Sequence, residues 1–161
     1  MSIQHLEETI PSKPEVLVLV GLPASGKTTY AREWLLEDPT HRMRINFDDL
    51  RLELYGPQWV FNYSQEKLMK IEAYSRADMA LRAGKSVVID NTNLTEKARE
   101  PWIKLAHSHG IKPELFEIDT PVAECIRRDE LRTGTARVGR EVIERFALDC
   151  GFKIGDSDEQ L

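Results

Sequence analysis

The sequence predicts a single α/β domain, built on a mostly parallel sheet with helices on both of its faces. Its 161 residues are enough for one domain with a hydrophobic core. Short β-branched runs alternate with longer stretches of helical periodicity, and this alternation is typical of βα units around a parallel sheet. The runs are apolar enough for strands that are buried on both sides.

Four such runs are predicted to form the centre of the sheet. They cover residues 15–20, 43–47, 86–90 and 113–119. The longest helix between them is predicted to begin after Ser64, as its N-cap, and to end at Gly84. Its apolar positions recur at steps of three and four residues, at Leu68, Ile71, Tyr74, Ala77 and Leu81.

The remaining helices are predicted from their terminal residues. Thr120 and Pro121 supply an N-cap and a first-turn proline for one helix, and the last helix is predicted to start near Gly139. Within residues 95–109 the signals conflict, because Thr95 resembles an N-cap whereas Pro101 would interrupt a helix begun that early. That helix is therefore predicted either to kink at Pro101 or to begin near it.

The ends of the chain, residues 1–13 and 154–161, are polar and are predicted to be mobile. The domain would then cover residues 14–153.

Composition limits the classes of protein that the chain can belong to. With 22 Lys+Arg against 27 Asp+Glu, the net charge of −5 does not indicate nucleic acid, although an acidic protein can present a local basic groove. The longest aliphatic run, at residues 16–20, is too short to span a membrane, and the acidic start does not resemble a secretory signal. Cys125 and Cys150 lack metal-ligand or CxxC spacing, so we expect reduced thiols and a cytoplasmic protein without a membrane partner.

The strongest motif is GLPASGKTT at residues 21–29, which fits the phosphate loop G-x-x-x-x-G-K-[ST]. A predicted strand precedes it and a helical pattern begins at Lys27, so backbone N–H groups can converge on the phosphates of a nucleoside triphosphate. Lys27 is expected to reach the β- and γ-phosphates, and the Thr28 hydroxyl is expected to ligate Mg²⁺. The expected nucleotide-binding residues of this loop are Gly21, Ala24, Ser25, Gly26, Lys27, Thr28 and Thr29.

The segment INFDDLR at residues 45–51 places Asp48 just past the second predicted strand. In a doubly wound sheet the ligand crevice lies outside the carboxyl ends of the strands, so Asp48 would face the phosphates and could accept a proton from an attacking hydroxyl. Arg51 follows one helical turn later and could bind a second anionic group. The alternative is that Asp48 caps a helix that starts at Asp49, with Arg51 as a solvated surface charge.

The segment VVIDNTNL at residues 87–94 ends a third strand in polar side chains. Asp90 is the candidate to hold Mg²⁺ together with Thr28. Asn91, Thr92 and Asn93 could position a substrate, but such clusters after a strand are also ordinary turn formers.

The segment IRRDELRTGTARVGR at residues 126–140 contains five arginines around a Gly-Thr break. Arg128 and Arg132 are spaced i, i+4, so they are expected on one helix face before a flexible hinge. A hinged arginine lid of this kind could close over the donor phosphates and exclude water. The alternative is a surface helix whose charges pair with Asp129 and Glu130.

In this order, the four segments resemble the kinase domain of the 5′-hydroxyl polynucleotide kinases, from about residue 15 to residue 150. The resemblance implies a P-loop NTPase-type sheet with a helical lid, ATP and Mg²⁺ as cofactors, and phosphate transfer to 5′-OH ends of DNA or RNA. It further implies that Asp48 is the general base on the 5′-OH, and that Arg51 contacts the 3′ phosphate of the terminal nucleotide. Arg128 and Arg132 would contact the donor phosphates and act in catalysis with Lys27.

Two other functions are compatible with the same motifs. A kinase of a small metabolite or nucleoside would use the phosphate loop and Asp48, but it would not need Arg51 to hold a phosphodiester. A nucleotide-binding switch module would transfer no phosphate to any acceptor.

Overall fold

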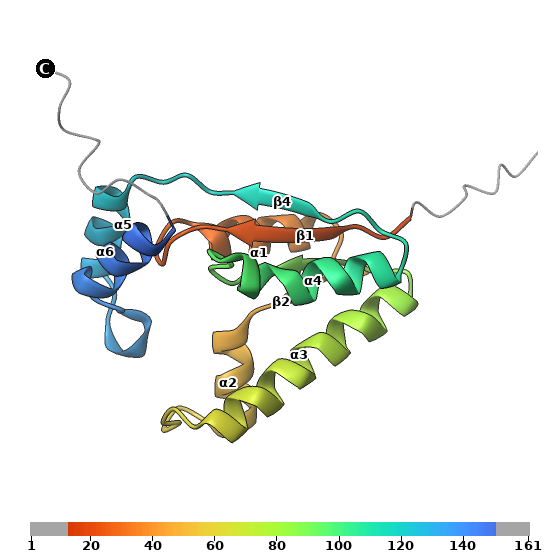
Figure 1. The fold of residues 1–161 in the computed structure, drawn as a ribbon, viewed down its shortest axis with the longest axis horizontal. Helices are drawn as coiled ribbons and strands as arrows, with labels where there is room; N and C mark the ends of the chain where they lie inside the picture. Colours follow the sequence, from red (N-terminus) through yellow and green to blue (C-terminus); the bar gives the residue numbers. More distant parts are fainter. Residues whose placement is uncertain (1–12, 151–161) are drawn as a thin grey trace, which may run out of the picture.

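The computed structural model describes residues 13–150, which fold into a parallel sheet between two layers of helices (Figure 1). The strands are β1 (Val16–Val20), β2 (Arg42–Ile45), β3 (Ser86–Ile89) and β4 (Glu114–Glu117), in the order β2-β3-β1-β4. Every neighbouring pair is parallel. The predicted α/β fold class is therefore confirmed. Strands β1, β3 and β4 lie within the predicted runs, and β2 begins one residue before its run, at Arg42.

The two outer strands are less buried than predicted. The central strands β1 and β3 are almost fully enclosed, whereas Leu115 of β4 is half-exposed and Glu114 and Glu117 face solvent. An edge strand has a neighbour on one side only, so its side chains remain partly in water even in a sheet with helices on both faces.

Six helices and one short 3₁₀ turn accompany the sheet in the described part of the chain. They are α1 (Lys27–Glu37), α2 (Phe47–Tyr55), α3 (Tyr63–Arg82), α4 (Glu96–Ser108), α5 (Val122–Glu130) and α6 (Arg140–Asp149), with the 3₁₀ turn at Gly134–Ala136. Within residues 13–150, no helix combines the length and the apolar character that crossing a bilayer requires.

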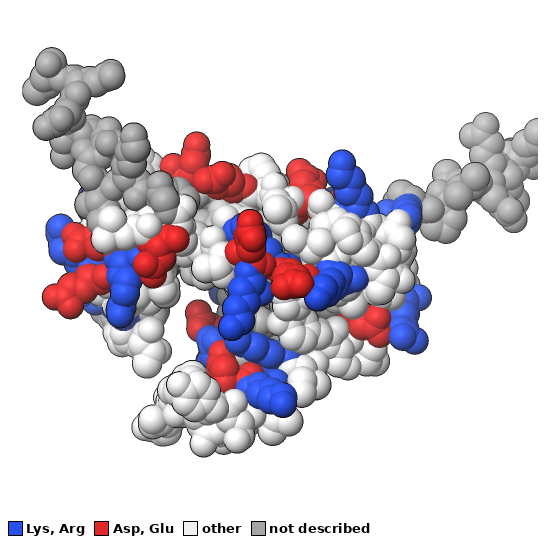
Figure 2. Space-filling model, viewed as in Figure 1, with Lys and Arg blue, Asp and Glu red and all other residues white. Residues whose placement is uncertain are grey.

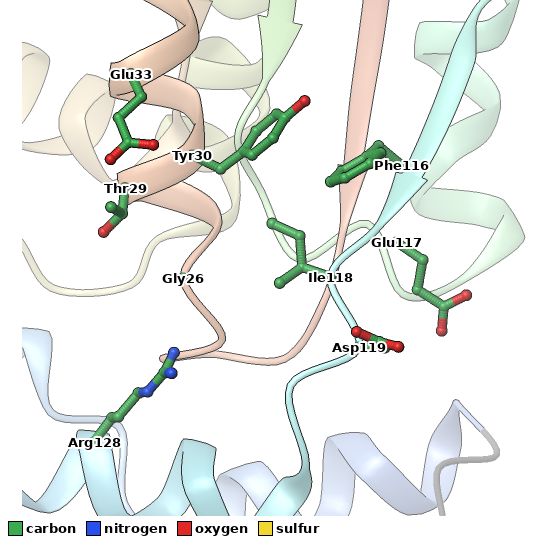
Figure 3. A pocket seen from close by; sticks show the side chains of 9 residues that line it. All are labelled: Gly26, Thr29, Tyr30, Glu33, Phe116, Glu117, Ile118, Asp119 and Arg128. Atoms are coloured by element: carbon green, nitrogen blue, oxygen red, sulfur yellow. The ribbon is translucent and has the colours of Figure 1, made fainter.

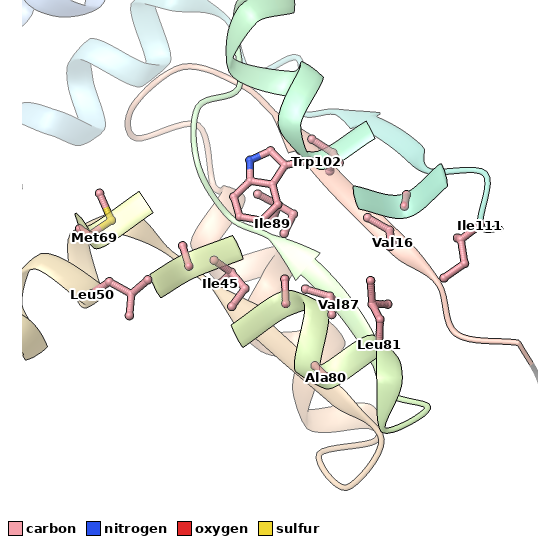
Figure 4. Close-up of a cluster of buried hydrophobic side chains, with 14 residues drawn as sticks. Val16, Ile45, Leu50, Met69, Ala80, Leu81, Val87, Ile89, Trp102 and Ile111 are labelled. Carbon is pink, nitrogen blue, oxygen red and sulfur yellow. The ribbon is translucent and has the colours of Figure 1, made fainter. Parts of the chain in front are cut away.

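The main hydrophobic core lies between the sheet and helices α3 and α4 (Figure 4). Trp102 of α4 is fully buried there and packs against Tyr74 and Phe47, with ring centroids 4.6 Å and 6.0 Å apart. An aromatic side chain of this size removes a large apolar area from water, which is the main stabilising contribution of such a core.

The other face of the sheet is covered by α1. Ala31 is buried against Leu17, Leu19 and Val88, and the small side chain lets the helix approach the strands closely. This contact fixes the start of α1 relative to the end of β1.

A third cluster joins α5 and α6 to the loop after β1. Leu22 of that loop is buried with Val122, Cys125 and Ile126 of α5 and with Ile143 of α6. Figure 1 shows both helices at the carboxyl end of the sheet rather than on one of its faces. The two helices are thus attached to the loop that follows β1.

Helix α3 differs from its prediction in its start and in two of its five predicted core positions. Its N-cap is Asn62, whose side chain accepts a hydrogen bond from the Gln65 amide, and not Ser64. Leu68 and Ile71 are 59% and 53% exposed. Ala77 and Leu81 are buried as predicted, Tyr74 packs partly buried against the same core, and the face is completed by Met69, Ala73 and Ala80. Three alanines in this set allow the helix to lie close to the sheet.

Three other helix starts are resolved by the structure. Thr95 caps α4, and Pro101 lies inside that helix, so the helix does not begin at the proline. Gly139 is the N-cap of α6, as predicted. The prediction for α5 is wrong, because Pro121 occupies the N-cap position while the Thr120 hydroxyl donates to the Ser25 carbonyl at 2.7 Å.

The predicted mobile ends, 1–13 and 154–161, lie outside the described residues except for Lys13.

The start of α3 gives a prediction about stability. Asn62→Ala should lower the free energy of unfolding by about 1 kcal/mol, because it removes the hydrogen bond to the Gln65 amide. Ser64→Ala is the matched control and should change it by less than about 0.5 kcal/mol. Urea denaturation of both variants measures this, and a larger loss for Ser64→Ala would contradict the assigned cap.

Candidate active site

The phosphate loop leads directly from β1 into α1 and has a backbone that few residues could adopt. Ala24 and Gly26 have positive φ angles of 63° and 105°, and Gly26 is the N-cap of α1. A Cβ at Gly21 would lie 2.8 Å from the Ser25 hydroxyl and 3.1 Å from the Ile118 carbonyl, so glycine is required there for space. This turn directs the first N–H groups of α1 toward the open end of the loop, where they can bind phosphate.

Lys27 folds back over the loop. Its ammonium group donates to the Leu22 carbonyl at 2.6 Å and to the Ser25 hydroxyl at 3.3 Å. Burial lowers the pKa of Lys27 to about 8, and the negative charge of Asp90 partly opposes that shift. Asp48 and Arg132 also act electrostatically on Lys27, so both predicted site residues lie within electrostatic range of the loop.

Thr28, in the first turn of α1, contacts Asp90, which directly follows β3. The Thr28 hydroxyl donates to Asp90 Oδ2 at 3.0 Å, and the Asp90 carboxylate is buried. Asp90 Oδ1 is also buried, without a hydrogen-bond partner among the described residues. These oxygens fit Mg²⁺, which typically binds one or two protein oxygens and completes its shell with phosphate and water. The described residues contain no group of three or more metal-binding side chains, so a metal here would depend on the nucleotide for its other ligands.

Arg44 on β2 is a residue of this site that the sequence did not indicate. Its Nε and Nη2 donate to Asp90 Oδ2 at 2.8 Å and 2.6 Å, and its Nη1 pairs with Asp49. The side chain is largely buried, so the guanidinium compensates the buried charge of Asp90. An arginine inside a short strand looks like an ordinary outward-facing charge, which is why the pattern gave no signal.

The Asn-Thr-Asn segment ties the ends of the strands together. Asn93 is buried with φ 47°, and its amide donates to the Leu19 carbonyl at 2.8 Å. The Thr92 carbonyl accepts from the Gly21 amide, and the Asn91 side chain accepts from the Phe47 amide. These contacts are those of turn formers, and the substrate roles of the three residues stay predictions.

Asp48 lies in the first turn of α2 with its side chain 87% exposed. The cap of α2 is Asn46, which accepts from the Asp49 amide at 2.9 Å, so the alternative that Asp48 is a helix cap is wrong. Asp48 is instead paired with Arg51, whose Nη1 donates to it at 2.6 Å. The expected shared face of Asp48 and Arg51 is therefore present.

Arg51 is also held by Glu66 of α3, a contact that the sequence did not reveal. Its Nε and Nη2 donate to the two carboxylate oxygens of Glu66 at 2.9 Å and 2.6 Å. The positive charge lowers the pKa of Glu66, mainly through these hydrogen bonds. The alternative of a solvated Arg51 is thus wrong, because the guanidinium is bidentate on one carboxylate and bonded to another.

The predicted lid differs from expectation at Arg132. Helix α5 ends at Glu130, so Arg132 lies beyond its end rather than on one helical face with Arg128. Arg128 donates to Glu124 at 2.9 Å and to the Ser25 carbonyl at 3.2 Å, which places it over the phosphate loop (Figure 3). Arg132 donates to the Ala136 carbonyl at 3.3 Å.

Asp129 anchors the segment that follows α5. It is buried and accepts from the amides of Val138 and Gly139 at 3.0 Å and 2.9 Å. The alternative of a surface ion pair is therefore wrong for Asp129, although Glu130 does lie 3.8 Å from Arg140. Residues 131–138 between these points are exposed throughout. The segment is thus fastened at both ends and free of the core between them.

A pocket of about 380 Å³ lies beside the loop, between α1 and the end of β4 (Figure 3). Tyr30 and Phe116 stack on one another beside it, with ring centroids 4.7 Å apart. Arg128 reaches the pocket from the opposite side. The pocket is lined by Gly26, Thr29, Tyr30, Glu33, Phe116, Glu117, Ile118, Asp119 and Arg128.

Together, a phosphate loop after the first strand, a parallel sheet and an acidic residue at the end of the neighbouring strand define a P-loop α/β domain. A family model described as an AAA domain matches residues 16–150, and the chain belongs to this family of P-loop nucleotide-binding domains.

Curated relatives carry names of polynucleotide kinases. The chain is 28% identical over 84% of its length to a bifunctional polynucleotide kinase/RNA ligase named in Autographa californica nuclear polyhedrosis virus. It is 35% identical over 60% of its length to the bifunctional polynucleotide phosphatase/kinase of Schizosaccharomyces pombe. The chain spans 21% and 19% of these relatives, so it is similar to one part of each.

A solved structure of the Pnkp1/Rnl/Hen1 RNA repair complex contains a similar fold. One of its chains superposes with a TM-score of 0.73 and 25% identity, over 86% of this chain and 44% of that one.

The contact between Arg44 and Asp90 gives a prediction for a double-mutant cycle. Arg44→Gln should lower the free energy of unfolding by roughly 3 kcal/mol, because it leaves the Asp90 carboxylate buried without its partner. The double variant Arg44→Gln/Asp90→Asn should lose less than the sum of the single variants, by about 1–3 kcal/mol. Arg82→Gln removes an exposed ion pair and serves as the control, with an expected loss below about 0.5 kcal/mol. Additive losses in the cycle would mean that the two side chains are not coupled.

Proposed function

We propose that this domain is an ATP-dependent polynucleotide 5′-hydroxyl kinase, which transfers the γ-phosphate of ATP to 5′-OH ends of DNA or RNA with Mg²⁺. The observation that carries the proposal is the exposed Asp48 carboxylate, held by Arg51 at the carboxyl edge of the sheet and within electrostatic range of Lys27. The names of the relatives support the same activity. Each relative is much longer than this chain, so the activity is carried over to it as a proposal.

The donor nucleotide would use the loop and the pocket beside it. The backbone N–H groups of the loop and the Lys27 ammonium would hold the β- and γ-phosphates, in place of the contacts that Lys27 makes to Leu22 and Ser25. Thr28 and Asp90 would hold Mg²⁺, which supplies charge neutralisation on the phosphates when bound. The nucleoside would extend past Thr29 into the pocket beside Tyr30.

The acceptor would approach from the side of α2. Its 5′-oxygen attacks the γ-phosphorus in line, the bond from that phosphorus to the β-phosphate oxygen breaks, and ADP leaves. Asp48 takes the proton of the 5′-hydroxyl as the new bond forms. Arg51 donates to Asp48 Oδ1 alone, so Oδ2 can take this proton. A 3′ phosphate on the acceptor would draw that Nη1 away while Glu66 keeps the rest of the guanidinium in place.

The arginines after Cys125 would close the site. Arg128 already lies over the loop, and Arg132 lies on an exposed segment that can move without disturbing the buried core. Both charges would stabilise the phosphate in transfer, and the closed segment would exclude water.

One observation favours a second candidate function. Arg51 is already paired with both Asp48 and Glu66, so it has no free hydrogen-bonding fork for a phosphodiester in this state. A kinase of a small hydroxyl-bearing metabolite or nucleoside would need only Asp48.

The cytoplasm stays the proposed location, because both described cysteines are free thiols.

The pair on α2 separates the two functions by mutation. Asp48→Asn should lower kcat by roughly 10²-fold or more on every 5′-OH acceptor, because the amide cannot take the proton. Arg51→Ala should lower kcat/KM for a nucleoside 3′-monophosphate by about 10-fold or more and hardly affect the plain nucleoside. Steady-state transfer of labelled γ-phosphate measures both effects.

Glu53→Gln is the control for Asp48, since it neutralises another exposed carboxylate on α2, one that pairs with Arg76 and not with a residue of the site. Full activity of Asp48→Asn would remove the general-base role. Equal losses for Arg51→Ala on both acceptors would favour the small-acceptor kinase. Transfer to no acceptor at all by the wild type would favour the nucleotide-binding switch.

The lid gives a separate prediction. Arg132→Ala and Arg128→Ala should each lower kcat by roughly 10³-fold, because each removes a positive charge from the phosphate in transfer. Arg127→Ala is the matched control, since Arg127 lies on the same helix and contacts Glu124 on an exposed surface. Single-turnover transfer rates test this, and losses of only a few-fold for both lid variants would leave the segment without a catalytic role.

A further inference from the structure

The turn between α2 and α3, together with the first residue of α3, carries aromatic side chains at every second position, and the last two of the three are exposed. Trp59, Phe61 and Tyr63 follow one another in space as well as in sequence, with ring centroids 6.2 Å apart for the first pair and 4.8 Å for the second. Phe61 is 55% exposed and Tyr63 is 84% exposed. In Figure 2 the end of the molecule that carries this turn shows mainly uncharged surface. Large aromatic side chains left in water in a cluster mark a binding surface more often than chance.

This aromatic turn is continuous with the acceptor site. The Arg51 guanidinium lies 5.7 Å from the centre of the Trp59 ring, while its Nη1 contacts Asp48. The indole N–H donates to the Gln65 side chain at 3.1 Å, so Trp59 is held in position between Arg51 and the outer aromatic residues. A path of contacts therefore runs from the proposed general base to Tyr63.

The chemistry of the turn favours nucleic-acid bases as the occupant. Aromatic rings stack on bases of any sequence, and this is how proteins bind single strands without reading their order. Arg51 is proposed to hold the 3′ phosphate of the terminal nucleotide, and that phosphate leads to the second nucleotide. The second base would consequently arrive beside Trp59 and Phe61. Lys67 and Lys70 are exposed in the first turns of α3 and can supply charge to the phosphates beyond.

We propose that Trp59, Phe61 and Tyr63 form a stacking surface for the bases that follow the 5′-terminal nucleotide. The preferred acceptor is then a single-stranded end of several nucleotides, rather than a mononucleotide or a blunt duplex whose bases are already stacked. This inference rests on the proposed function of the same site, and it adds the form of the acceptor.

The experiment compares acceptors of different length. The wild type should show a higher kcat/KM for a 5′-OH single strand of about ten nucleotides than for a nucleoside 3′-monophosphate or a blunt duplex. In Phe61→Ala/Tyr63→Ala, the ratio of kcat/KM for the strand to that for the monophosphate should fall by about 10- to 100-fold, because two stacked bases lose their partners. Val60→Ala is the control, since Val60 is 78% exposed in the same turn but has no ring, and its ratio should stay at the wild-type value.

Phe61→Leu separates stacking from general hydrophobic contact. It keeps an apolar side chain without a π face, so it should lower the ratio, whereas an unchanged ratio would overturn stacking. An unchanged ratio in the double alanine variant would overturn the proposal altogether. The aromatic turn would then serve a protein partner or a second copy of this chain, which the oligomeric state of wild type and variant would distinguish.

A binding measurement keeps the inference separate from the proposed function. Titration of the nucleotide-free protein with the same labelled single strand, without ATP, should give a Kd that rises by about 10-fold or more in the double variant. If the wild type transfers phosphate to no 5′-OH acceptor but this loss of binding occurs, the kinase proposal fails and the stacking surface stands. If transfer occurs without any preference for strands, the kinase stands and the stacking surface fails.

Discussion

The site depends on one buried amide, that of Asn93, which fastens the end of β3 to the end of β1. Its Nδ2 donates to the Leu19 carbonyl, and the neighbouring Thr92 carbonyl accepts from Gly21 at the start of the phosphate loop. Because β1 and β3 are parallel neighbours, this tie fixes the loop and Asp90 relative to each other. The Thr28 hydroxyl is thereby held at hydrogen-bonding distance from the Asp90 carboxylate. A left-handed backbone at Asn93 is tolerated because these hydrogen bonds offset its cost.

Around this frame, each carboxylate of the site is matched with a guanidinium. Arg44 lies against buried Asp90, and Arg51 lies between Asp48 and Glu66. The pairs differ in burial, since Asp90 is enclosed and Asp48 is exposed. The enclosed pair resists water and holds a fixed geometry, whereas Asp48 faces solvent and can exchange partners at little cost. An acidic protein can thus place arginines where phosphates would arrive without a basic surface overall.

Much of the fold, and the identity of the main motifs, could be predicted from the sequence, because a phosphate loop requires particular residues in a fixed order. Contacts between distant segments could not. The pairing of Arg51 with Glu66 depends on where α3 lies, and the phase of α3 depends on alanines whose small size carries little signal in a hydrophobic pattern. The anchoring role of Asp129 could not be predicted either, because its partners are the backbone amides of Val138 and Gly139 and a backbone amide leaves no signal in a side-chain pattern.

Leu22 of the phosphate loop is buried in the same cluster as α5 and α6. A swing of these helices as one rigid body would pull that side chain out of its cluster and distort the loop that binds the donor. If the segment acts as the proposed lid, its movement would be confined to residues 131–137, because Val138 and Gly139 are held by Asp129. In the proposed kinase, the phosphate loop would therefore keep its shape while only a few exposed residues are reordered at each turnover.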